Sequence, residues 1–282
     1  MRERSAVRKY ADLIRETSNK WPNCEPSRRI EVGEYGRLTK DGIWEREGNI
    51  FEDDAFKEIV QNTTPIQHPT EDKIVVQTLY AREISFNIGI ESNVPPVLVE
   101  GGFNTSWKFS KHTGAVLVAL RPRLTSLDPK IKPAELFKHR SLQGYSIVTE
   151  VTTCMCYAMA LGNKGDSTVS LSFSASAPLA GLPLDAGGQF GTGWKASGGV
   201  RMHRTGGGDV PDRWTVMYLL KDIKPWWQRS PWRGGGPDDI ASASLDRLPT
   251  TAVPWGMLDS DGESDDDDEF ESISSEGSFT ED

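Results

Sequence analysis

Long stretches in which apolar and polar residues alternate constrain the fold of this chain more than any other feature. From Lys73 to Ile90 the even positions are mostly apolar and the odd positions mostly polar, which is typical of strands with one buried face. The stretch is much longer than the mean globular strand of about 5–6 residues. Alternation resumes from Val97 to Phe109 after a polar turn, so the two runs predict one long β-hairpin.

A second pair of runs follows the same rule. Apolar residues share one face from Tyr145 to Leu161, and after the polar turn Gly162–Asp166 the run Val169–Ala177 alternates with serines. These two runs predict a second long hairpin. Between the hairpins, Ala115–Leu120 is apolar at every position and predicts a central strand that is covered on both faces.

The N-terminal residues predict a helix rather than a strand. Between Arg4 and Lys20, one stripe of a helical wheel holds Val7, Tyr10, Ala11 and Ile14, with a row of arginines beside it. Together with the hairpins, this pattern predicts an α+β fold. Its parts are a twisted antiparallel β-sheet with long extendable hairpins, an amphipathic N-terminal helix, a few packing helices and a disordered acidic tail.

Charge divides the chain into two parts. Gly234–Asp282 holds 15 acidic residues and one basic residue, a net −14, and since the whole chain carries −9, Met1–Arg233 carries +5. We therefore predict a folded body at 1–233 and a disordered tail at 234–282, with only the apolar patch Val253–Leu258 left open. The tail is either a solubilising extension or an element that inhibits the basic body.

No export signal or membrane-spanning helix is expected. Met1–Val7 has no apolar stretch behind its charges, and the longest uncharged run, Ser167–Leu184, contains five serines and two prolines. The three cysteines are few and odd in number, which favours a reducing compartment over a disulfide framework. These features predict a cytoplasmic protein.

Catalytic motifs are scarce. The four histidines show neither the spacing of a helical metal pair nor a nucleophile elbow. Cys154 and Cys156, which alternation places on one strand face, could join His139 on a metal, but small buried thiols are the preferred interpretation. We expect no enzyme, no cofactor and no metal. We also expect no nucleic-acid partner, because a charge of +5 on the body is modest.

The alternating hairpins allow two functions. In one, their apolar faces pack on helices within a soluble, β-rich protein-interaction module. In the other, these faces later meet lipid, since a membrane-spanning β-strand needs only about 9–11 residues and many copies could close a barrel. The basic helix suits docking on anionic headgroups, and a lipid-binding helix together with insertable hairpins favours a pore-forming protein.

The order of these parts resembles the pore-forming domain of the gasdermins. In that family a helix bearing Leu and Arg runs into a strand that reads close to Tyr-Val-Val-Thr-Glu; here Glu135–Arg140 precedes Ile147–Val151, and Thr215–Leu220 is similar to the last strand of the domain. The resemblance covers residues 1–224. Animal members carry a large inhibitory C-terminal domain, whereas this short acidic tail resembles the short fungal gasdermins.

The resemblance implies a cell-death effector that is cytoplasmic when inactive and acts at the plasma membrane. It implies anionic lipids, further copies of the chain and an activating protease as partners; some fungal members instead respond to a partner variant, as in allorecognition. The basic-helix role carries over by position to Arg4, Arg8, Lys9 and Arg15. The residues predicted to enter the membrane are Ile84, Phe86, Ile88, Phe103, Val151, Met155, Val169, Leu171 and Phe173.

Overall fold

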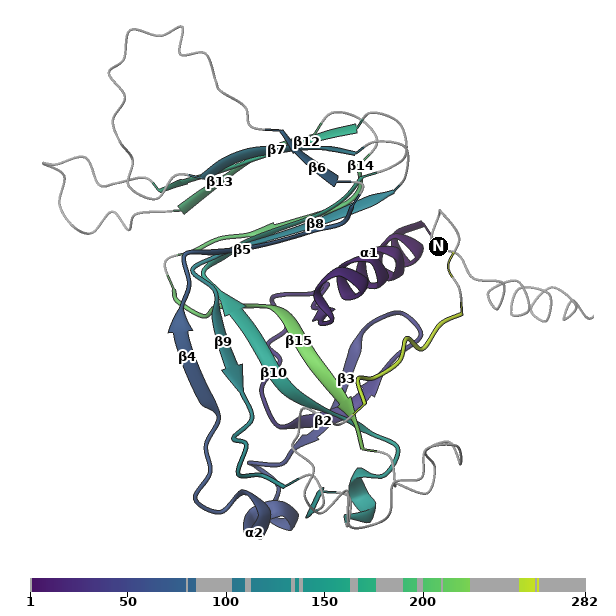
Figure 1. The fold of residues 1–282 in the computed structure, drawn as a ribbon, viewed down its shortest axis with the longest axis vertical. Coiled ribbons are helices and arrows are strands. Elements are labelled where there is room, and N and C mark those ends of the chain that lie inside the picture. The colour runs from purple at the N-terminus through teal and green to yellow at the C-terminus, as the bar shows by residue number, and fades with distance from the viewer. Residues whose placement is uncertain are drawn as a thin grey trace, which may run out of the picture.

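The described residues form three antiparallel sheets and one long helix, which confirms the predicted α+β class. The structure is a computed structural model that describes residues 2–79, 81–84, 103–109, 113–132, 135–136, 139–162, 167–175, 190–196, 200–208, 210–223, 249–256 and 258. Seven-stranded sheet A forms one end of the molecule, four-stranded sheets B and C are stacked at the other, and helix α1 lies between sheets A and B (Figure 1).

Helix α1 spans Arg2–Ser18, where the sequence predicted a helix from Arg4 to Lys20. Asn19 ends it by adopting a left-handed conformation with φ 60°, a common way for a helix to stop. The apolar stripe is buried: Tyr10 and Ile14 are 0% exposed, and the Tyr10 hydroxyl donates to the Val116 carbonyl at 3.3 Å. Burial of these side chains, at about 1.5–3 kcal/mol each for the aliphatic ones, fixes α1 against sheet B.

Sheet A has two branches that meet on strand β10, with β15 and β1 on one side and β2–β3 and β9–β4 on the other. Its strands are β1 (Trp21–Pro22), β2 (Glu34–Leu38), β3 (Trp44–Asn49), β4 (Ile66–Thr70), β9 (Arg123–Ser126), β10 (Ser146–Cys154) and β15 (Trp214–Asp222). The short helical turns near it are η1 (Asp54–Phe56), α2 (Lys57–Val60) and η2 (Arg140–Leu142). Gly42, at φ 77°, makes the tight β2–β3 turn.

Sheets B and C hold the segments for which the sequence predicted hairpins. Sheet B consists of β5 (Lys73–Gln77), β8 (Gly114–Leu120), β11 (Cys156–Gly162) and β14 (Val200–Gly206). Sheet C consists of β6 (Ala81–Ile84), β7 (Phe103–Phe109), β12 (Ser167–Ala175) and β13 (Phe190–Ala196). Every strand pair in both sheets is antiparallel.

The predicted hairpins differ from the observed strands in two ways. The run Lys73–Ile90 is divided into β5 and β6, and the run Tyr145–Leu161 into β10 and β11. The return strand at Val169–Ala177 was expected to pair with the preceding run, but β12 pairs with β7 and β13. The reason is that sheet B is apolar on both faces and therefore needs cover on both: α1 provides one layer and sheet C the other.

Two clusters of buried side chains express this layering. The larger cluster joins the α1 stripe to Leu117, Met159 and sheet A. The smaller cluster lies between sheets B and C and contains Ala81, Trp107, Phe109, Val116, Val118, Leu120, Cys156, Ala158 and Ala160. Strand β8, predicted as a central strand, thus contributes alternate residues to both clusters.

Candidate functional site

The basic side chains of α1 contact other parts of the chain. Arg4 and Arg8 both form ion pairs with Asp41 at the tip of the β2–β3 hairpin, the second with 3.5 Å between Arg8 Nη2 and Asp41 Oδ1. The Arg8 side chain is only 5% exposed, against 57% for Arg4. Arg8 was predicted to bind lipid, but its burial removes it from the surface in this conformation.

Arg15 lies in a cluster of aromatic rings at the other end of α1. Its guanidinium stacks over the Trp21 ring at 4.9 Å from the centroid, and Arg15 Nη2 donates to the Thr251 carbonyl at 3.2 Å. The Trp21 ring meets Trp255 edge to face, with 5.9 Å between centroids. Thr251 and Trp255 come from the acidic part of the chain, so that part lies against Arg15 and the Trp21 ring on which Arg15 stacks.

We call residues 249–256 and 258 the docked segment. Thr250 forms a β-bridge with Lys221, the Thr251 amide donates to the Leu220 carbonyl at 3.2 Å, and the Asp222 amide donates to the Pro249 carbonyl at 3.0 Å. In Figure 1 this yellow segment runs from the end of β15 past the β2–β3 hairpin. Disorder was predicted for the tail except at Val253–Leu258, which was left open; residues 249–252 are held by the hydrogen bonds above, and Trp255 of the open patch is 7% exposed within the main core.

A buried carboxylate secures the same segment. Asp222 Oδ1 accepts from the Thr251 hydroxyl at 2.7 Å and from the Ser146 hydroxyl at 3.0 Å. All three residues are less than 10% exposed. Burial of a carboxylate costs free energy unless the group is hydrogen-bonded. When the tail docks, the Thr251 hydroxyl supplies one of the hydrogen bonds that Asp222 needs at the end of β15.

Lys9 is half-buried on α1. Burial raises the pKa of the neighbouring Asp12, and the positive charge of Lys9 opposes that rise. Of the four basic residues predicted to bind lipid, Arg4 is therefore exposed, Lys9 and Arg15 are half-buried, and Arg8 is buried. A lipid surface could reach the whole row only after the hairpin tip and the docked segment have moved.

The residues predicted to enter the membrane lie at several places in the fold. Val151 is buried in β10 of sheet A, outside sheets B and C, and Met155 lies where the chain passes from sheet A to sheet B. Phe86 and Ile88 lie outside the described residues. The remaining positions are in strands of sheet C: Ile84 in β6, Phe103 in β7, and Val169, Leu171 and Phe173 in β12.

Sheets B and C have the same strand order. The strand order is β14-β11-β8-β5 in sheet B and β13-β12-β7-β6 in sheet C. Strands that follow each other in the sequence, such as β7 and β8, therefore hold the same position in the two sheets. We call the four consecutive pairs, β5–β6, β7–β8, β11–β12 and β13–β14, the folded ribbons. They amount to one four-stranded sheet folded over on itself, with its two halves stacked (Figure 1).

The two inner ribbons also keep their register across the fold. Gly162 pairs with Gly114 at the end of sheet B, and Ser167 pairs with Phe109 at the start of sheet C. The two pairs are five residues apart on each of the two ribbons. The outer ribbon β5–β6 does not keep its register. Gln77 and Ala81 are four residues apart, whereas their partners in β8 and β7, Val116 and Phe109, are seven residues apart. The inner pair alone could straighten without a change of partners.

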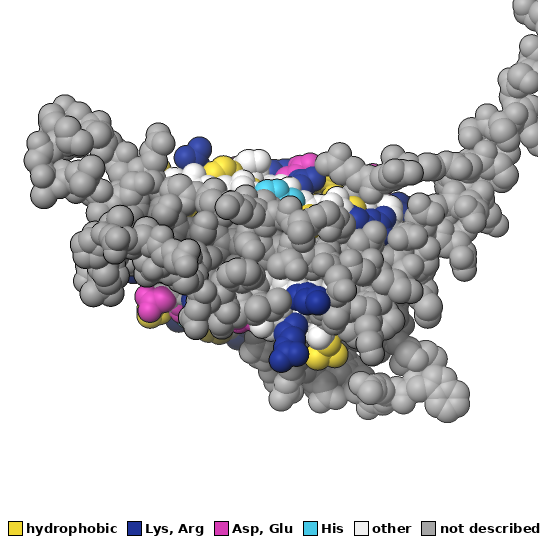
Figure 2. All heavy atoms as spheres, turned by 90° about the horizontal axis from the view of Figure 1, so that it is seen from above, with side chains coloured by type: hydrophobic (Ala, Val, Ile, Leu, Met, Phe, Trp, Pro, Cys, Tyr) yellow, Lys and Arg dark blue, Asp and Glu magenta, His cyan; other side chains and the backbone are white. Residues whose placement is uncertain are grey.

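The described side chains at this end of the molecule do not form one exposed apolar patch. Seen from above, the coloured hydrophobic side chains are scattered among basic and neutral ones (Figure 2). Within the described chain, only Ile66, Leu79 and Val210 are large hydrophobic residues with high exposure. Leu79 is 98% exposed and lies between β5 and β6, at the bend of the outer ribbon.

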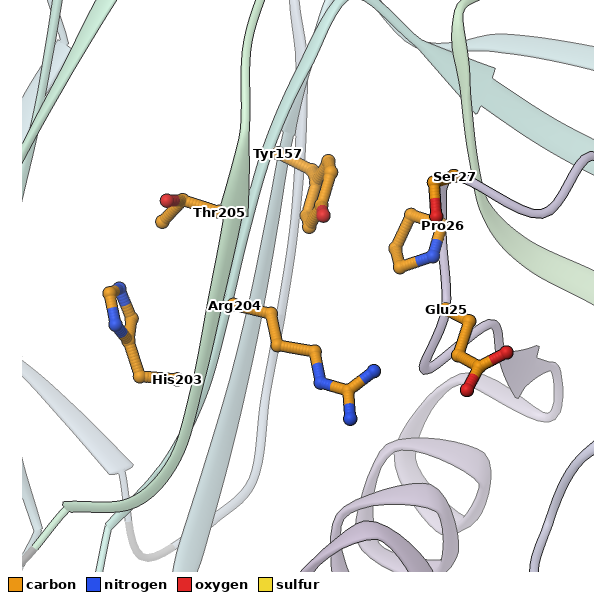
Figure 3. A pocket seen from close by; sticks show the side chains of 7 residues that line it. All are labelled: Glu25, Pro26, Ser27, Tyr157, His203, Arg204 and Thr205. Carbon is orange, nitrogen blue, oxygen red and sulfur yellow. The ribbon is translucent and has the colours of Figure 1, made fainter.

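A polar hollow of about 530 Å³ lies beside sheet B and is drawn in Figure 3. Arg204 of β14 projects across it toward the loop after β1 and donates to the Cys24 carbonyl. His203 projects from the other side of that strand, and burial lowers its pKa. The arginine thus ties a loop to a strand, which is a structural role.

The structure does not bring Cys154, Cys156 and His139 together. Cys154 belongs to the main core and Cys156 to the cluster between sheets B and C, because β10 ends at one cysteine and β11 begins at the other. His139 instead stacks on Phe56, with 4.9 Å between ring centroids. In the part of the chain that the structure describes, no group of three or more His, Cys, Asp or Glu residues could hold a metal ion.

No protein-family model matches the chain, and no curated protein matches it either. No helix among the described residues is long and apolar enough to cross a membrane.

Sequence reasoning missed three parts of this site: Asp41, the docked segment and the register of the inner ribbons. Asp41 was assigned only to a turn, and its role depends on a contact with α1 that no local pattern encodes. Trp255 gave a signal, since a tryptophan within an apolar patch is unusual in an acidic tail. The register became visible only when the strands were paired.

Proposed function

We propose that this protein is a pore-forming cell-death effector of the gasdermin type, which binds anionic lipid, assembles with further copies and inserts the folded ribbons. The observation that carries the proposal is the shared strand order of sheets B and C, with unbroken register in the inner ribbons. A sheet folded in this way can lengthen by straightening its bend.

The lengths fit a bilayer. A straightened inner ribbon would run from Phe103 to Leu120 beside Cys156 to Ala175, which at about 3.3 Å per residue gives roughly 60 Å. The hydrocarbon core is about 30 Å thick. Straight strands would therefore cross it with length to spare, while their base remains joined to sheet A through β10 and β11.

Alternation then supplies the lipid-facing side. In an unbroken strand, residues two apart share a face, so Phe103, Trp107 and Phe109 fall on one side with Val169, Leu171 and Phe173 of the partner strand. In the half that comes from sheet C the other side carries Asn, Ser, Lys and Thr, whereas in the half that comes from sheet B it carries Val116, Val118 and Leu120. In lipid each backbone group needs a hydrogen-bond partner, so the outer ribbons must pair with those of neighbouring copies.

Control is proposed to lie in the docked segment and the acidic residues around it. The segment holds Arg15 through Thr251 and Trp255, and the tail carries a net −14. A basic residue near an anionic surface contributes about 1 kcal/mol. Release of the segment uncovers Arg15 and would thus add about 1 kcal/mol of attraction, less where salt screens it; Arg8 becomes available only when it also leaves Asp41.

The test uses the full chain with a protease recognition sequence in place of Gly234–Asp239. After the cut, the segment could stay docked through its own contacts, so the same chain is also made with Trp255→Ala. We expect the cut variant to release dye from vesicles of phosphatidylserine and phosphatidylcholine, and far less from phosphatidylcholine alone. A scrambled recognition sequence is the matched control.

Two results would contradict the proposal. Binding of the cut variant to anionic vesicles without any dye release would leave a lipid-binding protein that forms no pore. Absence of both binding and release, with an intact fold, would favour the soluble interaction module and would leave the cytoplasm-to-membrane transition without support.

A further inference from the structure

The bend of the inner ribbons contains an unusually close contact between one ring and two glycines. Gly114 and Gly162 face each other across β8 and β11, and the Phe109 ring lies over both. A Cβ on Gly162 would lie 2.2 Å from Phe109 Cδ2, and one on Gly114 would lie 2.7 Å from Phe109 Cδ1. Phe109 is 0% exposed. The ring therefore occupies space that exists only because both positions lack a side chain.

This contact exists only while the ribbon is folded. Phe109 and Gly114 are five residues apart on one chain, which in a straight strand is about 17 Å. An odd separation also places them on opposite faces of a straight strand. On the neighbouring ribbon β11–β12, Gly162 and Ser167, the partner of Phe109, are likewise five residues apart. Straightening must separate the ring from both glycines, whereas the strand pairing itself can persist.

We propose that Phe109, seated on the Gly114–Gly162 pair, is the catch that keeps sheet C closed on sheet B, and that its release starts the straightening of the ribbons. The first half of this inference concerns the closed fold alone; the second rests on the proposed function. A second tie supports the catch: Trp107 Nε1 of β7 donates to Gln77 Oε1 of β5 at 2.9 Å, again between the two sheets.

Three buried cysteines provide a readout that is independent of membranes. Cys156 lies between sheets B and C, whereas Cys24 and Cys154 lie in the main core. Opening of the two sheets should expose Cys156 alone, while global unfolding exposes all three. Labelling of the full chain with iodoacetamide at pH 8, followed by tandem mass spectrometry whose fragment ions assign the label to Cys154 or Cys156 within their shared peptide, separates the two events.

Removal of the ring or addition of a methyl group should release the catch. We expect Phe109→Ala to accelerate labelling of Cys156 by about 100-fold or more, as expected for loss of a buried phenyl ring, with Cys24 and Cys154, which need global unfolding, still labelled far more slowly than Cys156. Gly162→Ala should act in the same direction. Because the ring and the new methyl group compete for one space, the double variant should label no faster than Phe109→Ala alone.

The matched control is Phe56→Ala, which removes an equally buried ring from the main core. It should not favour Cys156 over the other two cysteines. Labelling of all three cysteines at one rate in Phe109→Ala, or no acceleration of Cys156, would overturn the catch. If Phe109→Ala does not fold, Phe109→Leu and Gly114→Ala make the same comparison. Loss of vesicle leakage would count against the pore and leave this labelling result untouched.

Discussion

Truncation of Trp255 should undock the C-terminal segment without unfolding the body. The indole is 7% exposed and meets Trp21 edge to face, and replacing a buried aromatic side chain by alanine costs about 3–5 kcal/mol. Since about 1.4 kcal/mol corresponds to a tenfold change in an equilibrium constant, Trp255→Ala should raise the undocked population by about 10²- to 10³-fold.

Hydrogen exchange measures this population directly. The Thr251 amide donates to the Leu220 carbonyl and the Asp222 amide to the Pro249 carbonyl, so both bonds break when the segment leaves. Both amides should exchange faster by the same factor in Trp255→Ala, up to the limit set by complete undocking. The Gly33 amide, which donates to Val148 within the body at 2.9 Å, should keep its rate.

The control variant is Ala252→Ser, an exposed position of the same segment, which should leave all three rates unchanged. Unaltered exchange at Thr251 in Trp255→Ala would refute the reasoning, since the segment would then be held by its backbone and Thr251 contacts alone. Acceleration at Gly33 to the same extent would show that the segment leaves only when the whole body unfolds.

Three further outcomes are expected. Asp41→Asn removes the shared carboxylate partner of Arg4 and Arg8, so it should increase sedimentation with anionic vesicles and lower the thermal midpoint; unchanged sedimentation would place lipid binding elsewhere. Burial raises the pKa of Glu34 above its ordinary 4.5, so the folded chain retains a proton that the unfolded chain has lost, and the free energy of unfolding falls as pH rises through this interval. Glu34→Gln cannot ionise and should reduce that fall in urea denaturation between pH 4 and 7, leaving the part that Asp12 contributes. Burial raises the pKa of the Cys24 thiol to about 12, so at pH 8 the folded chain should be alkylated there only as fast as it opens, and urea should remove the protection.

Patterns that act within one element could be predicted from the sequence. The stripe of Val7, Tyr10 and Ile14 is buried as a helical wheel requires, and Gly42 makes the turn between β2 and β3. Ala115–Leu120 is covered on both faces, as expected for a strand in which every side chain is apolar. In each case the periodicity and the residue type act over a few neighbouring positions.

The bends and the covered site could not be predicted in the same way. Alternation reverses at Thr78 and Leu79, where the chain passes from sheet B to sheet C, and resumes beyond them; a short break of this kind in a period of two does not show that the strand bends there. Arg8 belongs to the basic row on a wheel, yet its burial is set by Asp41, which lies 33 residues further along the chain. Such contacts depend on how whole elements pack.

The four strands of sheet B alternate in direction, and this has a geometric consequence. Strands β5 and β14 form the two margins of the sheet and run in opposite senses. If identical molecules are placed side by side by rotation about a common axis, β14 of one molecule therefore lies next to β5 of the next molecule. These two strands are antiparallel, as β-sheet pairing favours. In such an arrangement each junction would repeat the last, and the curvature of the sheet would set how many molecules close a circle.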